Sequence, residues 1–166
     1  MRSTLPFAML ALAILPPPAA TAELPDAIAA PGEVLVATVQ AVGAQIYQCE
    51  FDAAGNLIWH FREPIATLVA DGRTVGRHYA GPNWEMTDGS AVKGKVTGHA
   101  PAADAGDIPL LRLAVAAQHG AGQLAGVTTI QRINTRGGVS GETCHSYGTF
   151  LSVPYTADYA FYRKRG

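Results

Sequence analysis

The chain has 166 residues, with 12 Lys and Arg against 13 Asp and Glu, and 48% of the residues are hydrophobic. This length suits one ordinary domain, large enough to bury a core. The near-neutral charge argues against a nucleic-acid partner, because the dense basic run is confined to residues 163–165 instead of forming a stripe within the fold.

The first 22 residues have the pattern of a secretory signal peptide. Arg2 supplies a positive start, Leu5 to Leu15 is an apolar run, and Ala20 to Ala22 fits an A-x-A cleavage site. The run is too short to span a membrane, and three prolines end it. We therefore expect a signal peptide at 1–22 and a single β-domain at 23–166. The mature protein is expected to be exported, periplasmic or extracellular, with no membrane span after cleavage.

The mature segment opens with the period-two alternation of half-buried β-strands. Tyr47, Cys49 and Phe51 share one face of one segment, and Leu57, Trp59 and Phe61 share one face of the next. Residues 52–56, rich in Asp, Gly and Asn, are typical of a turn. The two segments are therefore expected to form a β-hairpin.

The alternation continues to the end of the chain. Asp71-Gly72 and Asp88-Gly89 signal tight turns. Segments 111–115, 127–133 and 153–162 alternate again, and residues 120–126 join the first two of these. We expect one helical turn at 26–30, a short helix at 65–70 and a loop at 100–107. The pattern predicts an all-β fold, a compact antiparallel β-sandwich or partly closed β-barrel with at most short helical turns.

Cys49 and Cys144 are the two cysteines of the chain. In an oxidising compartment an isolated pair is typical of a disulfide, which is the interpretation we favour. Two alternatives stay open at this point: separate reduced thiols, or metal ligands that act with a nearby histidine such as His145.

Several motifs occur in an order that resembles one known family. They are QIYQC at 45–49, WHF at 59–61, GRHYAGPNWE at 76–85, DGS at 88–90, IQR at 130–132, NT at 134–135 and PYTADY at 154–159. The chain resembles the exported domain-of-unknown-function family 3455 over nearly all of residues 23–166. The resemblance implies a secreted bacterial or fungal protein with no agreed activity.

No cofactor is expected from the sequence. Residues 120–126, GAGQLAG, have some likeness to a dinucleotide-binding loop. The third glycine comes one residue late, and the following segment alternates with period two instead of forming a helix. We interpret this segment as a hairpin connection.

The block from His78 to Ser90 is the best candidate for a site. A Gly81-Pro82 turn is expected to place His78 and Tyr79 on one side and Trp84 and Glu85 on the other. Aromatic rings beside a carboxylate can stack on a small molecule or glycan while the acid accepts its hydroxyls. The ligand-binding candidates are His78, Tyr79, Trp84, Glu85, Asp88 and Trp59. A structural interpretation, with Trp84 in the core, stays open.

Catalytic and metal-binding patterns are weak. Glu85 and Asp88 lie three residues apart across a turn, so they are not obviously opposed over a cleft as a glycosidase pair would be. The five histidines lack the H-x-H or H-E-x-x-H spacing of metal ligands, and no metal site is expected.

The sequence therefore predicts an exported ligand-binding or envelope-associated module. One alternative is a secreted hydrolase or metal-assisted enzyme that uses His78 with Glu85 or Asp88. The other is a structural or protein-partner domain. The reaction, the identity of the ligand and the oligomeric state do not follow from the sequence.

Overall fold

A computed structural model describes residues 24–166, and the expected signal peptide at 1–22 lies outside this range. The described chain is all-β apart from one 3-10 turn, as expected. Its elements are η1 (Asp26–Ile28), β1 (Glu33–Phe51), β2 (Leu57–Ala70), β3 (Arg73–Tyr79), β4 (Asn83–Met86), β5 (Ala91–Ala100), β6 (Leu110–His119), β7 (Thr129–Gly137) and β8 (Phe150–Lys164). No helix within these residues is long and apolar enough to cross a bilayer.

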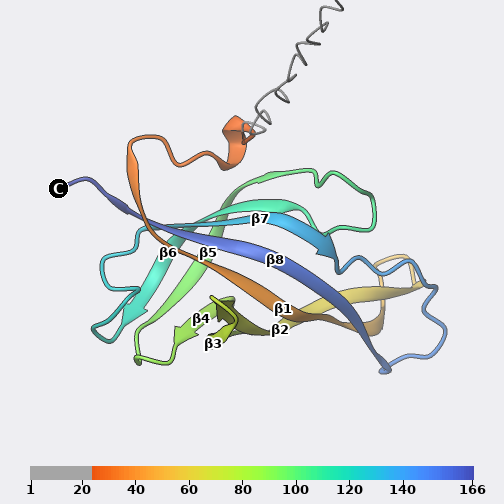
Figure 1. Ribbon diagram of the computed structural model, residues 1–166. Helices are drawn as coiled ribbons and strands as arrows, with labels where there is room; N and C mark the ends of the chain where they lie inside the picture. Colours follow the sequence, from red (N-terminus) through yellow and green to blue (C-terminus); the bar gives the residue numbers. More distant parts are fainter. Residues whose placement is uncertain (1–23) are drawn as a thin grey trace, which may run out of the picture.

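The strands form one antiparallel sheet that closes into a barrel. Each strand pairs with the next along the chain, and β8 returns to pair with β1. The β1–β8 ladder runs from Glu33↔Lys164 to Gln48↔Phe150, and these long strands lie side by side across the molecule (Figure 1). Of the two architectures expected from the sequence, the molecule therefore adopts the barrel, and the barrel is fully closed.

The turns follow the sequence signals closely. Asp71 and Gly72 have φ angles of 48° and 73° and join β2 to β3. Residues 52–56 join β1 to β2, which confirms the first hairpin. The short helix expected at 65–70 is wrong, because these residues belong to β2. Ala66 and Leu68 are buried there while Ile65 and Thr67 face outward, so pairing with β1 overrides the local helical preference.

Inward-facing side chains of β1, β2 and β4 to β8 pack into the hydrophobic core. Trp84 is the largest of these fully buried side chains, and its indole needs a position without a side chain opposite. Gly94 on β5 supplies it: a Cβ there would lie 2.9 Å from the Trp84 ring. The core also contains Val39, Ala41, Ala66, Leu68, Met86, Val92, Ile108, Leu113, Leu124, Val127, Ile130, Tyr155, Ala157, Tyr159 and Phe161.

The N-terminal turn η1 covers the outer surface of the barrel wall. Gln131, the neighbour of the core residue Ile130 on β7, is buried because η1 lies over it and the Ile28 carbonyl accepts a 2.5 Å hydrogen bond from its Nε2. Gly98 on β5 permits this approach, since a Cβ there would clash with the Ala27 carbonyl oxygen.

A disulfide ties the segment between β7 and β8 to the β1–β2 hairpin. Cys49 and Cys144 are bonded, with Cα atoms 5.7 Å apart, and both are buried. The Tyr47 hydroxyl donates a 2.6 Å hydrogen bond to the Gly138 carbonyl and fixes the start of the same segment. The predicted disulfide is therefore confirmed, and the thiol and metal-ligand alternatives for this pair are wrong.

Removing this disulfide is expected to destabilise the barrel. The bond spans 95 positions, for which the chain-entropy description gives an upper figure of about 4.7 kcal/mol, with ~2–4 kcal/mol typical. We expect a Cys49→Ala/Cys144→Ala double variant to lose ~2–4 kcal/mol of unfolding free energy in urea titrations. Reductant should lower the stability of the wild type and leave the double variant unchanged. Equal stability of the oxidised wild type and the double variant would contradict this assignment.

Candidate functional site

The His78–Ser90 block divides between the two faces of the barrel wall. His78 pairs with Trp84 across the β3–β4 hairpin, and Arg77 pairs with Glu85. Because side chains alternate along a strand, the first pair points inward and the second outward. The expected turn at Gly81-Pro82 is present, but it does not bring all the candidate residues to one surface.

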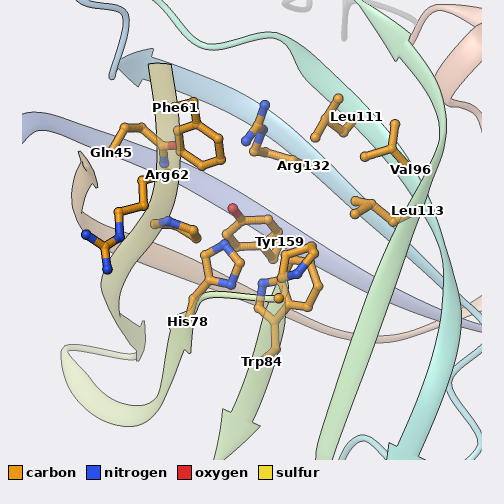
Figure 2. A pocket seen from close by; sticks show the side chains of 13 residues that line it. Gln45, Phe61, Arg62, His78, Trp84, Val96, Leu111, Leu113, Arg132 and Tyr159 are labelled. Carbon is orange, nitrogen blue, oxygen red and sulfur yellow. The ribbon is translucent and has the colours of Figure 1, made fainter. Parts of the chain in front are cut away.

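The inward pair forms an aromatic cluster with β8. The rings of His78 and Trp84 are stacked, with centroids 4.4 Å apart and planes 12° apart. Tyr159 meets the indole edge-on at 5.1 Å, and Figure 2 shows the three rings grouped together inside the barrel. This geometry is favourable for aromatic side chains. The cluster forms a rigid wall and also part of the core.

The His78 ring is uncharged, and its Nε2 atom can accept a hydrogen bond. Its Nδ1 lies 2.8 Å from the Asn83 carbonyl oxygen, which can only accept, so Nδ1 carries the proton. Burial lowers the pKa of His78 to about 4; the bond to Asn83 opposes this effect and the charge of Arg132 adds to it. At neutral pH the ring is therefore uncharged, and Nε2 keeps its lone pair.

The outward residues satisfy one another on the barrel surface. Glu85 accepts hydrogen bonds from Arg77 at 2.9 Å and from the Tyr79 hydroxyl at 2.9 Å, and the Arg77 guanidinium lies over the Tyr79 ring. The Arg77 and Tyr79 bonds lower the pKa of Glu85. Tyr79 and Glu85 therefore form a surface cluster on the opposite side of the wall from His78.

Asp88 organises a junction between two loops. Its carboxylate accepts hydrogen bonds from the Ser90 amide at 2.8 Å, the Ser90 hydroxyl at 2.6 Å and the Gln123 amide at 2.7 Å. Ser90 Oγ in turn accepts a bond from the Leu124 amide at 3.1 Å. These bonds fix the 120–126 connection over the barrel end, where Leu124 is fully buried, and they account for Asp88 without a ligand.

Trp59 lies away from the other candidates. It pairs with Cys49 on the β1–β2 hairpin and lines a shallow surface hollow with Tyr47 and Cys144. Its buried Nε1 has no hydrogen-bond partner. The structure therefore brings His78 and Trp84 together, groups Tyr79 with Glu85 elsewhere, and separates Asp88 and Trp59 from both.

A cavity of about 270 Å³ opens beside the aromatic cluster. Phe61 and Val96, 45% and 50% exposed, stand at its rim, and Figure 2 shows Val96, Leu111 and Leu113 across from His78 and Trp84. The space equals about nine water volumes. Its lining is mainly apolar and consists of Gln45, Phe61, Arg62, Pro64, His78, Gly81, Pro82, Trp84, Val96, Leu111, Leu113, Arg132 and Tyr159.

Most of this lining, including Gln45, Arg132 and Tyr159, is not among the residues predicted from the sequence. Arg132 gives a usable signal, because it shares the alternating face of Ile130, a core residue. A charged residue on the buried face of a strand indicates a site or a barrel end. Gln45 gives none, since its burial depends on the pairing of β1 with both β2 and β8.

The cavity lining is positively charged. Arg62 and Arg132 are its cationic residues, and no Asp or Glu belongs to the lining. Arg132 Nε and Nη2 both donate to the Pro109 carbonyl, at 3.0 Å and 2.8 Å. Within residues 24–166 no cluster of three or more His, Cys, Asp or Glu side chains has the geometry to hold a metal ion.

The buried His78 is expected to make stability depend on pH. The unfolded His titrates near 6.5 and the folded one near 4, so the unfolded state binds more protons between these values. Stability is therefore full above pH 6.5 and falls by about 3 kcal/mol as the pH drops to 4. In urea titrations over this range, His78→Phe should remove that part of the dependence. An identical pH profile for both proteins would contradict a neutral, buried His78.

Comparisons with known proteins identify one family. Residues 69–163, more than half of the chain, match the family described as a protein of unknown function, DUF3455. The match includes the His78–Glu85 block, Arg132 and Tyr159, whereas the motifs at 45–49 and 59–61 precede it. No curated protein and no solved structure shows significant similarity to the chain. The chain belongs to the DUF3455 family.

Proposed function

We propose that this protein is an exported binding module that holds a small, mainly apolar molecule in the mouth of its barrel. The observation that carries the proposal is the open cavity beside His78 and Trp84. Eight-stranded barrels have an interior that side chains either fill or leave open for one small ligand. Here they fill one end, and the other keeps a space with aromatic and aliphatic walls.

The size and lining of the cavity also indicate the kind of molecule that it suits. The small volume and apolar lining suit a compact molecule better than an oligosaccharide.

The hydrolase alternative lacks support from the geometry. His78 points into the barrel, Glu85 points outward into its pair with Arg77, and Asp88 is engaged with Ser90 and Gln123. A general acid and base must both reach the reacting bond. These three residues do not converge on one space, so we do not propose a reaction.

Blocking the cavity mouth tests the proposal. Val96→Trp places a large side chain at the half-exposed rim, and Val42→Trp, on the outward face of β1 and 46% exposed, is a matched control. In a panel of small aromatic and aliphatic compounds, we expect at least one to raise the melting temperature by several degrees. A compound present at a hundred times its Kd adds about 2.7 kcal/mol to the free energy of unfolding. Val96→Trp should abolish the shift, and Val42→Trp should keep it.

The shift can be assigned to the cavity by fluorescence. Trp59 and Trp84 are the two tryptophans of the chain, so Trp59→Phe leaves Trp84 as the only indole reporter. Ligand addition should change its emission with the same midpoint as the thermal shift. Compounds that bind Val96→Trp as well as the wild type, or none that bind at all, would favour the structural or protein-partner alternative.

Export is tested separately by intact mass. The confirmed disulfide fits an oxidising compartment. When the full chain is expressed in a bacterium that secretes proteins, we expect the extracytoplasmic fraction to contain a species that starts at Glu23 and carries the disulfide. Recovery of the full chain, with Met1 retained in the cytoplasmic fraction, would contradict cleavage after residue 22.

A further inference from the structure

We infer that the molecule held in the barrel mouth is a small aromatic carboxylate, with its carboxylate at Arg132 and its ring against Trp84 and His78. This inference rests on the proposed function and names the ligand class for the same cavity. It follows from the unpaired charge of Arg132 and from the aromatic and aliphatic walls of the cavity.

Arg132 is a half-buried cation without a counter-ion. It lines the cavity, yet among residues 24–166 it forms no ion pair with a carboxylate. The Pro109 carbonyl accepts from two of its nitrogens, and a guanidinium has five N–H donors, so further donors are available. A guanidinium beside apolar walls is costly unless an anion pairs with it, and a carboxylate fits its fork geometry.

The second cation of the lining is already engaged. Arg62 Nε lies 3.4 Å from a Glu63 carboxylate oxygen, and its guanidinium lies 5.0 Å from the centre of the Phe150 ring. Arg62 is also exposed to solvent. An anion inside the cavity is therefore expected to depend on Arg132 and much less on Arg62.

Gln45 is a polar neighbour of Arg132 at the cavity (Figure 2). The side chain is 2% exposed, and its Nε2 is fully enclosed, so this nitrogen does not face the open space. The carboxylate is therefore assigned to Arg132 and not to Gln45.

The opposite wall suits an aromatic ring and not the acid group. The His78–Trp84 stack and Tyr159 offer aromatic surface, and Leu111 and Leu113 line the facing side. The lone pair of the neutral His78 Nε2 would repel a carboxylate there. The acid is therefore directed toward Arg132, and a single ring with one carboxylate fits a space of about nine water volumes.

The test compares benzoate with benzamide and benzylamine, which keep the ring and make the polar group neutral or cationic. Using the protein purified after export, Kd is measured by calorimetry and by Trp84 emission in the Trp59→Phe background. We expect benzoate to bind at least tenfold tighter than benzamide and benzylamine to bind weakest. Arg132→Met should remove the preference for benzoate over benzamide, whereas Arg73→Met, at an exposed arginine outside the cavity lining, should keep it.

Arg132→Lys and a melting curve for each variant distinguish a loss of binding from a loss of folding. If Arg132→Met unfolds, Arg132→Lys is expected to fold and to bind benzoate with reduced affinity, because lysine keeps the charge but loses the fork. Equal binding of benzoate and benzamide, blocked by Val96→Trp, would overturn the carboxylate assignment and leave the proposed function intact. Failure of all three compounds to bind at millimolar concentration, together with no hit in the wider panel, would overturn both.

Discussion

The pairing of β1 with β8 is the constraint on which the rest of the structure depends. It closes the sheet, so every strand has an inner and an outer face. Along each strand of the barrel wall, neighbouring residues face opposite sides. His78 and Trp84 therefore point into the barrel, while Tyr79 and Glu85 point outward. Closure thus decides which residues of a short motif can act together. It also places Arg132 of β7 and Gln45 of β1 around one cavity although 87 positions separate them in the chain.

The fold was largely predictable because its determinants are local. The alternation of apolar residues and the Asp-Gly turns place most strands and hairpins correctly. The short helix expected at 65–70 failed because an alanine- and leucine-containing segment has no strong local preference, and pairing with β1 decides its conformation. The choice between sandwich and barrel depends on β1 meeting β8, which no short stretch of sequence records.

The candidate site was predictable only in part, for the same reason. The sequence singled out His78 and Trp84, which meet in the barrel. It also grouped Tyr79, Glu85 and Asp88 with them, because proximity along the chain hides the change of face and the loop contacts of Asp88. The cavity itself draws on all eight strands, so Arg132, Tyr159 and Leu113 have no shared motif. The one available signal was Arg132, a charged residue on the same strand face as the core residue Ile130.

The most direct test of binding in the barrel mouth is a nuclear magnetic resonance titration that follows the indole N–H signals of Trp84 and Trp59 and the guanidinium N–H signals of Arg132. Benzoate should shift the Trp84 and Arg132 signals together and saturably, because both residues line the cavity. Trp59, which lies beside the disulfide, should stay in place and serves as the internal control. Unchanged Trp84 and Arg132 signals, or an equal shift of Trp59, would contradict a ligand site in the barrel mouth.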